Sequence, residues 1–336
     1  MSGPLGYHPR MTAPRLDLLA IGNAIVDVIA PAGDPLIASA GLVKGSMRLI
    51  GADEALALHA AMAAPREICG GSAANTAVGI AALGGRAGFV GLVGPDALGS
   101  LFTQDLRAAG VEAHVPVERS APTARCLVLV SADGQRSMCT FPGAAHLLSP
   151  THVDAAAVAS AAILYLEGYL WDSPTARAAM EHGIAIARAA GRKVAITPSD
   201  IACVQRCGDR FRALLASGAV DMLFLNRAEA EALAGAPDLE DALARLAPQV
   251  ELLVVTLGEH GALALAGGER VHVPAAPAAR VVDTTGAGDL FAAGFLFAYA
   301  RGRPLDRCLS LGARLAAHII ADYGARPGRD LSALGR

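Results

Sequence analysis

Short apolar runs alternate along the chain with longer stretches of helical spacing, and this alternation predicts the fold. The apolar runs are typical of strands buried on both faces of a sheet, and they lie at 18–21, 87–93, 162–166, 193–197, 222–225 and 252–256. Stretches of helical periodicity separate them, at 52–64, 70–83, 98–109, 174–190, 209–216, 228–234 and 239–246. Strands joined by such crossover helices pair in parallel. We therefore expect an α/β fold whose doubly wound, mostly parallel sheet is flanked by helices.

A second pattern predicts a smaller sheet. Residues 25–29 form an extended run around Asp27, and residues 124–130 and 135–141 are two strand-like runs joined by Ser131-Ala132-Asp133-Gly134. An Asp-Gly pair between two such runs is a strong hairpin signal. We expect these segments to form a small β lid beside the large sheet.

The two patterns divide the chain into domains. We expect the large domain to comprise residues 16–23, 51–114 and 143–330, and the lid to comprise residues 24–50 and 115–142. The first 15 residues contain Gly, Pro and His without periodicity, so they are expected to be a disordered leader, and Met11 is an alternative start.

Composition restricts the class of protein. Hydrophobic residues make up 53% of the 336 residues and charged residues 18%, which is typical of a compact enzyme and not of a disordered chain. The longest apolar stretches, at 155–166 and 290–300, are shorter than the roughly 20 residues that span a bilayer. A net charge of −3 without a basic cluster gives no reason to expect nucleic acid. A small-molecule substrate is the expected partner, for a monomer or a homodimer.

The six cysteines carry no metal-binding or disulfide pattern. They follow no repeated spacing, and no apolar signal peptide precedes the first strand, so reduced thiols in the cytoplasm are expected. Cys203 and Cys207 have a spacing that suits one helix face, but no second Cys or His pair lies near them in the sequence.

The most informative segment is Asp283-Thr284-Thr285-Gly286-Ala287-Gly288-Asp289. It lies between a short strand-like run at 279–282 and an apolar helix at 290–300, so a helix is expected to begin within 286–289. The two glycines permit a sharp turn and a close approach to a ligand, and the free N–H groups of a helix start bind phosphate. Asp289 could alternatively be only an acidic residue that complements the helix dipole. Two glycines and two acids in seven residues favour a phosphoryl-transfer site.

With these motifs in order, the chain resembles the ribokinase-like (PfkB) family of carbohydrate and nucleoside kinases over residues 16–327. Gly70-Gly71-Ser72-Ala73-Ala74-Asn75 is similar to the first signature of that family, and residues 282–294 are similar to the second. Asn226-Arg227-Ala228-Glu229 is similar to the Asn-x-x-Glu motif that organises magnesium and phosphate. The resemblance implies a ribokinase-like fold, with ATP and Mg²⁺ as cofactors.

The resemblance assigns the transfer chemistry to the segment at 283–289. Asp289 would be the general base, and the helix-start amides of Ala287, Gly288 and Asp289 would receive the γ-phosphoryl oxygens, with Gly286 in the turn before them. Asp283 and Thr285 would supply oxygens to a potassium-like ion.

The resemblance also places the nucleotide. Asn226 and Glu229 would hold the waters of Mg²⁺ and the triphosphate, although Asn followed three residues later by Glu also fits a helix capping box. Thr256, Gly258 and Gly261 are similar to the strand–turn segment that borders the nucleotide. Gly324 is similar to the turn beside the adenine and the monovalent cation.

On the acceptor side, the resemblance implies that Asn23, Asp27, Gly71 and Asn75 hold sugar hydroxyls. Asn23 could instead be a turn residue, but Asp27 interrupts a strand, where Asp is disfavoured unless it binds something. Arg136 is similar to a lid arginine that reaches the transferred phosphoryl group, and a surface cation is the alternative.

The identity of the acceptor rests on a finer likeness within the family. Residues 22–28, 44–47 and 165–171 look most like those of bacterial adenosine kinases, and Tyr169 could line an adenine pocket or belong to the core. The expected activity is phosphorylation of a primary hydroxyl by ATP, converting adenosine to AMP. A kinase of ribose, fructose or a keto-deoxy acid is the first alternative, and a catalytically silent nucleoside-binding protein is the second. A nicotinamide-linked dehydrogenase is disfavoured because no Gly-x-Gly-x-x-Gly follows the first strand.

Overall fold

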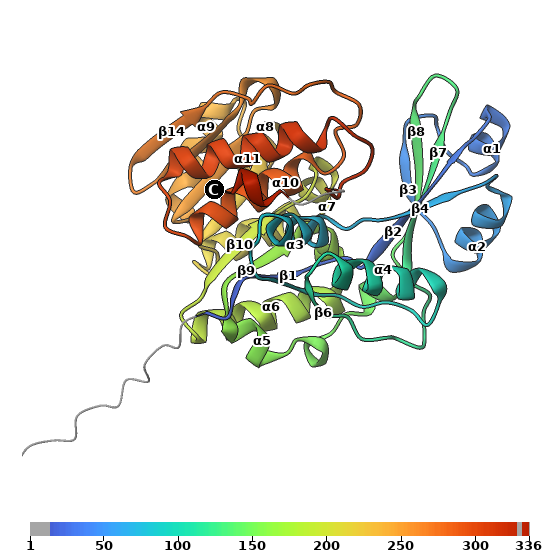
Figure 1. Ribbon diagram of the computed structural model, residues 1–336, viewed down its shortest axis with the longest axis horizontal. Helices are drawn as coiled ribbons and strands as arrows, with labels where there is room; N and C mark the ends of the chain where they lie inside the picture. Colours follow the sequence, from blue (N-terminus) through green and yellow to red (C-terminus); the bar gives the residue numbers. More distant parts are fainter. Residues whose placement is uncertain (1–13, 328–330, 336) are drawn as a thin grey trace, which may run out of the picture.

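The computed structural model describes residues 14–327 and 331–335. The expected leader, apart from its last two residues, and the alternative start at Met11 therefore lie outside the described residues. Figure 1 shows a large α/β body on which a smaller lobe of strands and two short helices is mounted at one side. In the described residues no helix is long and apolar enough to cross a membrane.

The large body is built on a nine-stranded sheet in the order β14-β13-β12-β11-β10-β9-β1-β5-β6. All neighbouring strands in it pair in parallel except β12 with β13 and β13 with β14. Its strands are β1 (Leu16–Ile21), β5 (Ala87–Val90), β6 (Glu112–His114), β9 (Ala161–Glu167), β10 (Lys193–Thr197), β11 (Met222–Asn226), β12 (Leu252–Thr256), β13 (Ala262–Ala266) and β14 (Glu269–Val273). The predicted mostly parallel, doubly wound sheet is confirmed.

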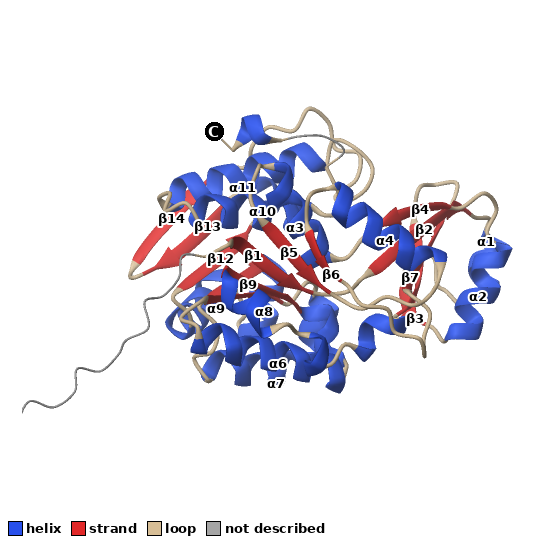
Figure 2. Ribbon diagram, turned by 60° about the horizontal axis from the view of Figure 1, so that its bottom comes forward, coloured by secondary structure: helices blue, strands red, loops and turns tan. Residues whose placement is uncertain are grey.

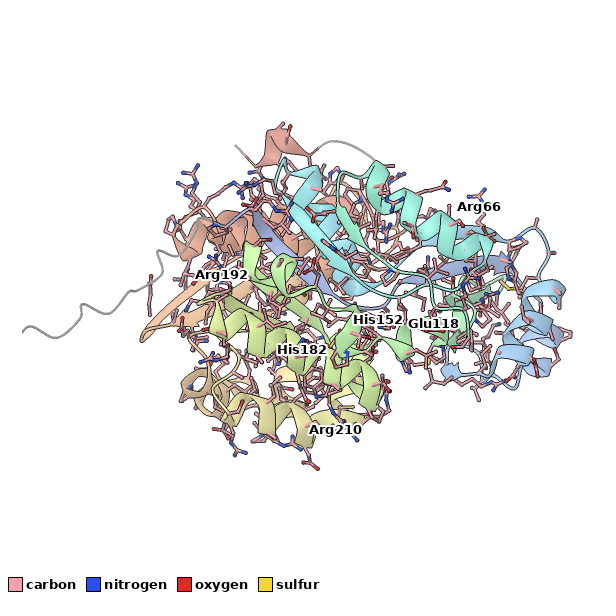
Figure 3. The ribbon with its side chains drawn as sticks, turned by 90° about the horizontal axis from the view of Figure 1, so that it is seen from below. Arg66, Glu118, His152, His182, Arg192 and Arg210 are labelled. Carbon is pink, nitrogen blue, oxygen red and sulfur yellow. The ribbon has the colours of Figure 1, made fainter. Side chains whose placement is uncertain are left out.

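Helices cover both faces of this sheet, as Figure 2 shows. One face carries α3 (Ser72–Ala82), α10 (Ala287–Tyr299) and α11 (Leu305–Ile319), and α4 (Ala97–Ala108) lies near the lid. The other face carries α5 (Ala155–Ser160), α6 (Pro174–Ala189), α7 (Ile201–Ala216), α8 (Arg227–Ala234) and α9 (Leu239–Leu246). Figure 3 views this second face from outside, with His182 on α6 and Arg210 on α7. Buried apolar side chains form two cores, and one of them continues into the lid.

Short 3₁₀ turns join these elements. They are Gly143–Leu147, Pro150–His152, Gly168–Asp172, Ala247–Gln249, Gly258–His260 and Ser332–Leu334.

The lid is a five-stranded sheet in the order β3-β8-β7-β2-β4. Its strands are β2 (Ile25–Pro31), β3 (Met47–Leu49), β4 (Arg66–Cys69), β7 (Ala124–Val130) and β8 (Arg136–Phe141), and α1 (Asp34–Ser39) and α2 (Ala52–Ala61) belong to the same lobe. The hairpin of β7 and β8 was predicted. Residues 51–69 were expected in the large domain, but β4 pairs antiparallel with β2 and α2 packs on β7 and β8. The boundary differs because strand pairing between distant segments leaves no local signal in the sequence.

Two local predictions also need correction. Residues 279–282 form no strand, and Val282 instead donates its N–H to the carbonyl of Ile320. Helix α7 begins at Ile201, eight residues earlier than its apolar spacing predicted, because Asp200 caps it by accepting a hydrogen bond from the Cys203 N–H. The β13–β14 hairpin and α11 were not predicted from the pattern. The helix expected to start within 286–289 does begin there, at Ala287.

Candidate functional site

One cavity of about 770 Å³ lies where the large sheet meets the lid. The large sheet supplies residues at the carboxyl ends of its strands, including Thr197 of β10, Asn226 of β11 and Thr256 of β12. The lid supplies one face of its sheet, and α3 and α10 supply their first turns. Ligands of open α/β sheets bind at this edge. The cavity brings together residues that are far apart in the sequence.

The first turn of α10 forms one wall. Gly286 lies just before the helix in the left-handed region, with φ of 79°. A Cβ atom at this position would lie 2.5 Å from the Cβ atom of Ala325, so only glycine fits. Gly286, Ala287, Gly288 and Asp289 all line the cavity, as the motif predicted. The positive end of the helix dipole therefore faces the cavity.

Asp289 is held by side chains from another helix. Its carboxylate accepts hydrogen bonds from the Ser72 hydroxyl at 2.6 Å and from Nδ2 of Asn75 at 2.8 Å, both on α3. Burial raises the pKa of Asp289, and these two hydrogen bonds act in the opposite direction. Only an oriented carboxylate can take a proton from a hydroxyl in a defined position, so this arrangement fits a general base.

The polar group expected to hold the acceptor comes from the end of β1, from β2 and from the start of α3. Asn23, Asp27, Gly71 and Asn75 all line the cavity. Burial raises the pKa of Asp27 to about 6, and the positive charges of Arg326 and Arg136 oppose this rise. A buried carboxylate with a strongly shifted pKa in a cavity is typical of a binding or catalytic group.

Glu167 is a buried carboxylate at this site that sequence reasoning did not assign. Its two oxygens accept hydrogen bonds from the backbone N–H groups of Asn23 and Ala73, each at 2.7 Å. It thereby ties the end of β1 to the start of α3. Burial raises the pKa of Glu167 to about 7. The sequence did hold a signal for it, because an acidic residue that directly ends a buried apolar strand needs hydrogen-bond partners.

Asn226 and Glu229 line the cavity at the start of α8. They form a complete capping box: Asn226 accepts from the Glu229 N–H at 2.9 Å, and Glu229 accepts from the Asn226 N–H at 2.9 Å. The motif is therefore a helix capping box, which was the alternative interpretation. Burial raises the pKa of Glu229 to about 7. One oxygen of Glu229 also accepts from Nδ2 of Asn226 at 2.8 Å, so the carboxylate is oriented at the cavity.

The remaining nucleotide residues divide between the cavity and its surroundings. Thr256 lines it, as does Tyr169, which was expected on the acceptor side. Gly258 and Gly261 are not among the described residues that line it, and they form the turn between β12 and β13. Gly324 donates its N–H to Asp283 at 3.1 Å.

Asp283 is the centre of a small cluster that includes the lid. It accepts hydrogen bonds from the N–H and hydroxyl of Thr285, and its other oxygen accepts from Arg136 at 3.1 Å as well as from Gly324. Arg136 also donates to the Thr285 hydroxyl at 3.2 Å. Arg136 was expected near the transferred group, and its contacts are with the turn before α10. The side-chain oxygens of Asp283 and Thr285, which were expected to face a monovalent cation, are thus hydrogen-bonded to each other and to Arg136.

Arg326 is a further charged residue that the sequence did not reveal. It lies next to the cavity, contacting Asn75 and the Gly70 carbonyl. Its neighbour Ala325 lines the cavity, but Arg326 itself is not among the lining residues. No local pattern marks a single arginine after the last helix as part of a site.

The residues present fit ATP with Mg²⁺. The start of α10 offers N–H donors to a phosphate, and Glu229 offers the carboxylate that a hydrated Mg²⁺ prefers. In the described residues no group of three or more His, Cys, Asp or Glu side chains is arranged to hold a metal ion. Mg²⁺ is usually bound through one or two carboxylates together with substrate phosphates.

Comparison with known proteins agrees with this geometry. Residues 34–330 match the pfkB family carbohydrate kinase profile. The crystal structure of adenosine kinase from Sinorhizobium meliloti is 46% identical, with a TM-score of 0.88, over 95% of this chain and 98% of that one. Fructokinase-1 from Oryza sativa subsp. japonica is 32% identical over 68% of this chain and 72% of its own length. The ATP-dependent ribose-1-phosphate kinase of Halopiger xanaduensis is 31% identical over 80% of this chain and 86% of its own length.

Proposed function

The chain belongs to the pfkB family of carbohydrate kinases and is an ATP-dependent kinase of a sugar or a nucleoside, and on that premise we propose that its acceptor is adenosine. In this proposal the γ-phosphoryl group of ATP passes to the 5′-hydroxyl of adenosine, giving AMP and ADP. The 46% identity with an adenosine kinase supports the nucleoside. A structure described as a probable sugar kinase from Rhizobium etli CFN 42 is 44% identical, and the fructokinase and ribose-1-phosphate kinase relatives are 31–32% identical. Identity alone therefore does not choose between a nucleoside and a sugar, and a feature of the cavity has to discriminate.

That feature is the apolar surface that the lid turns toward the cavity. We define the apolar lid face as Ile25, Met47, Leu49, Cys126 and Met138, all of which line the cavity. Met47 and Leu49 are 40% and 53% exposed, although both are large apolar side chains. Exposed apolar side chains that gather in a cavity mark a binding surface. A purine base buries apolar area against such a face, whereas a free pentose or hexose offers mostly hydroxyl groups.

The registers of the lid strands place polar and apolar groups in one row. Asp27 of β2 pairs with Cys126 of β7, Cys126 pairs with Thr140 of β8, and Thr140 pairs with Leu49 of β3. Paired residues of neighbouring strands point to the same face of a sheet. A ribose gripped by Asp27 would therefore have its base directed along this row toward the apolar side chains. Tyr169 lines the cavity as well and offers an aromatic ring for stacking.

The transfer step uses Asp289 and the first turn of α10. Asp289 accepts the proton of the 5′-hydroxyl as the oxygen forms its bond to the γ-phosphorus and the bond from that phosphorus to the bridging oxygen of ADP breaks. The N–H groups at the start of α10 would stabilise the charge on the moving group. Glu229 and Asn226 would hold hydrated Mg²⁺, which neutralises phosphate charge when it is bound. Carbonyl groups near Asp283 would hold a potassium-like ion beside the anion hole.

A panel of acceptors tests the proposal. ADP release is measured with adenosine, other nucleosides, ribose, fructose and a keto-deoxy acid. The expected result is the highest kcat/KM with adenosine. Preference for a sugar would reject the nucleoside and keep the kinase, and no ADP release with any acceptor would favour a silent nucleoside-binding protein.

A lid variant tests the same proposal independently. Met138→Thr removes an apolar group from the apolar lid face. The lost apolar contact is worth about 1 kcal/mol, so KM for adenosine is expected to rise several-fold while KM for ATP stays unchanged. Val43→Thr is the matched control, because Val43 is 77% exposed on the lid and is not among the lining residues. An unchanged adenosine KM in Met138→Thr would contradict a base seated on this face.

A further inference from the structure

Arg326 is a buried cation that links three parts of the molecule behind the cavity wall. Its side chain is 10% exposed. Nε donates to Oδ1 of Asn75 at 3.2 Å, and Nη2 donates to the Gly70 carbonyl at 2.9 Å. Nη1 forms an ion pair with Asp105 of α4, and the guanidinium lies 5.2 Å from the centre of the Phe102 ring.

These contacts decide which way the Asn75 side chain points. A guanidinium has only donors, so the atom of Asn75 that faces Arg326 must be the carbonyl oxygen. The NH₂ group then faces Asp289, where it donates at 2.8 Å. An ionised carboxylate has only acceptors, so the opposite orientation of the amide would place two acceptors against each other. Arg326 and Asp289 thus require the same orientation of Asn75.

We infer that Arg326 is a positioning residue for phosphoryl transfer: through Asn75 it directs a hydrogen-bond donor at Asp289 and so favours the ionised carboxylate that acts as the base. The inference rests on the role of Asp289 proposed above and adds a residue that neither substrate contacts. Asp105 holds Arg326 from the outer side, and that carboxylate is 42% exposed, so the link runs from the surface of α4 to the base.

The surroundings of Asp289 explain why the donor group of Asn75 matters for its ionisation. Ser72 of α3 donates to the same carboxylate, while Tyr165 and Glu167 of β9 and Tyr169 are close enough to interact with it electrostatically. Burial raises the pKa of Asp289, and the hydrogen bonds from Ser72 and Asn75 act in the opposite direction. The negative charge of Asp289 in turn contributes to the raised pKa of Glu167. Burial lowers the pKa of Arg326 to about 10, so the guanidinium still carries its charge at neutral pH.

The first measurement is the pH dependence of kcat at saturating acceptor. Saturation removes any effect of Arg326 on acceptor binding through Asp27, whose pKa it also lowers. In Arg326→Gln the acidic limb of the profile is expected to move upward by about one pH unit, because a hydrogen bond to the ionised form is weakened. Asp105→Asn, which leaves the buried residues intact, is expected to move the limb in the same direction by a smaller amount.

The matched control is Arg301→Gln. Arg301 makes the same three kinds of contact, with the Asp17 carboxylate, the Phe297 carbonyl and the Phe297 ring, and it contacts no described residue of the cavity. Its profile is expected to keep the midpoint of the parent protein, whatever happens to its melting temperature. If Arg326→Gln and Asp105→Asn both lower the Tm but leave the acidic limb of the kcat–pH profile in place, Arg326 has only a structural role.

A second measurement does not depend on turnover. The protein labelled with ¹³C in its Asp carboxyl groups is titrated by NMR, and the Asp289 signal is assigned by its loss in Asp289→Asn. The Asp289 midpoint is expected to rise by about one unit in Arg326→Gln and to stay unchanged in Arg301→Gln. If the parent protein phosphorylates no acceptor, the proposed function fails, but this titration still decides whether Arg326 acts on Asp289. An unchanged midpoint would overturn the inference.

Discussion

Two helices begin at the wall of the same cavity, and they begin in opposite ways. Helix α8 closes its own first turn, since Asn226 and Glu229 exchange hydrogen bonds within a complete capping box. Helix α10 begins at Ala287, and the residue before it, Gly286, has no side chain to offer a cap. Both helices carry a carboxylate in the first turn, and burial raises the pKa of both. The difference lies in where the hydrogen bonds to each carboxylate originate.

Glu229 is bonded by its own helix turn, whereas Asp289 is bonded by Ser72 and Asn75, more than 200 residues away in the sequence. A local cap stabilises a helix whether or not a ligand binds. A carboxylate held by a second helix is oriented by the tertiary structure, at the cost of burying its charge. This difference supports the proposal that the chemistry belongs to α10 and that α8 has a supporting role.

Removing the carboxylate of α10 is expected to have the largest effect. Asp289→Asn keeps the shape of the side chain but cannot accept the proton, so kcat should fall by roughly 10²- to 10⁴-fold, measured as ADP release with adenosine. The matched control is Asp306→Asn, which changes an exposed acid in the first turn of α11. Turnover of Asp289→Asn within about tenfold of the parent protein would break the comparison.

The same kind of change in α8 is expected to act on the metal. Glu229→Gln can still accept a hydrogen bond from the Asn226 N–H, so the free energy of unfolding should change by less than about 1 kcal/mol. The Mg²⁺ concentration for half-maximal rate should rise roughly 10- to 100-fold, because an orienting carboxylate is lost. Glu231→Gln, on the outward side of the same helix and paired with Arg227, should leave that concentration unchanged. Equal Mg²⁺ dependence in the two variants would make Glu229 a cap alone.

The same contrast explains what could be predicted from the sequence. The β–α alternation, the start of α10 and the Asn226–Glu229 box depend on residues within a few positions of one another, and all three were predicted. The gathering of candidate residues around one cavity followed from the family resemblance. Local spacing alone would not have placed Asp27 and Asp289 in the same cavity.

What was missed depends on contacts between distant segments. Strand β4 joins the lid by pairing with β2, and Arg136 reaches Asp283 across 147 positions. Arg326 reaches Asn75 across 251 positions. Each of these is a single side chain or a short strand whose partner is fixed only by the folded structure, so no periodicity or motif in one sequence indicates it.

The turn before α10 offers a smaller and purely structural test. In Gly286→Ala the added Cβ atom would meet Ala325 at 2.5 Å, and the residue would have to keep φ near 79°. We expect the free energy of unfolding to fall by about 1–3 kcal/mol, read from urea denaturation, since alanine is strained in this region. Gly302→Ala serves as control, because that glycine also has positive φ but nothing within 4 Å of an added Cβ atom. Equal losses in the two variants would show that contact with Ala325 contributes nothing.

The smallest expected effect on stability comes two residues later, and it separates folding from function at α10. Gly288 lines the cavity, and a Cβ atom added there would meet nothing within 4 Å. Alanine is favoured over glycine inside a helix, so Gly288→Ala should raise the free energy of unfolding by about 0.5–1 kcal/mol. The added methyl group would occupy space at the helix start that a phosphoryl group needs, so KM for ATP should rise and kcat should fall. A protein that becomes more stable and less active would show that this glycine serves the ligand, whereas unchanged kinetics would leave the open space at α10 without a role in phosphate binding.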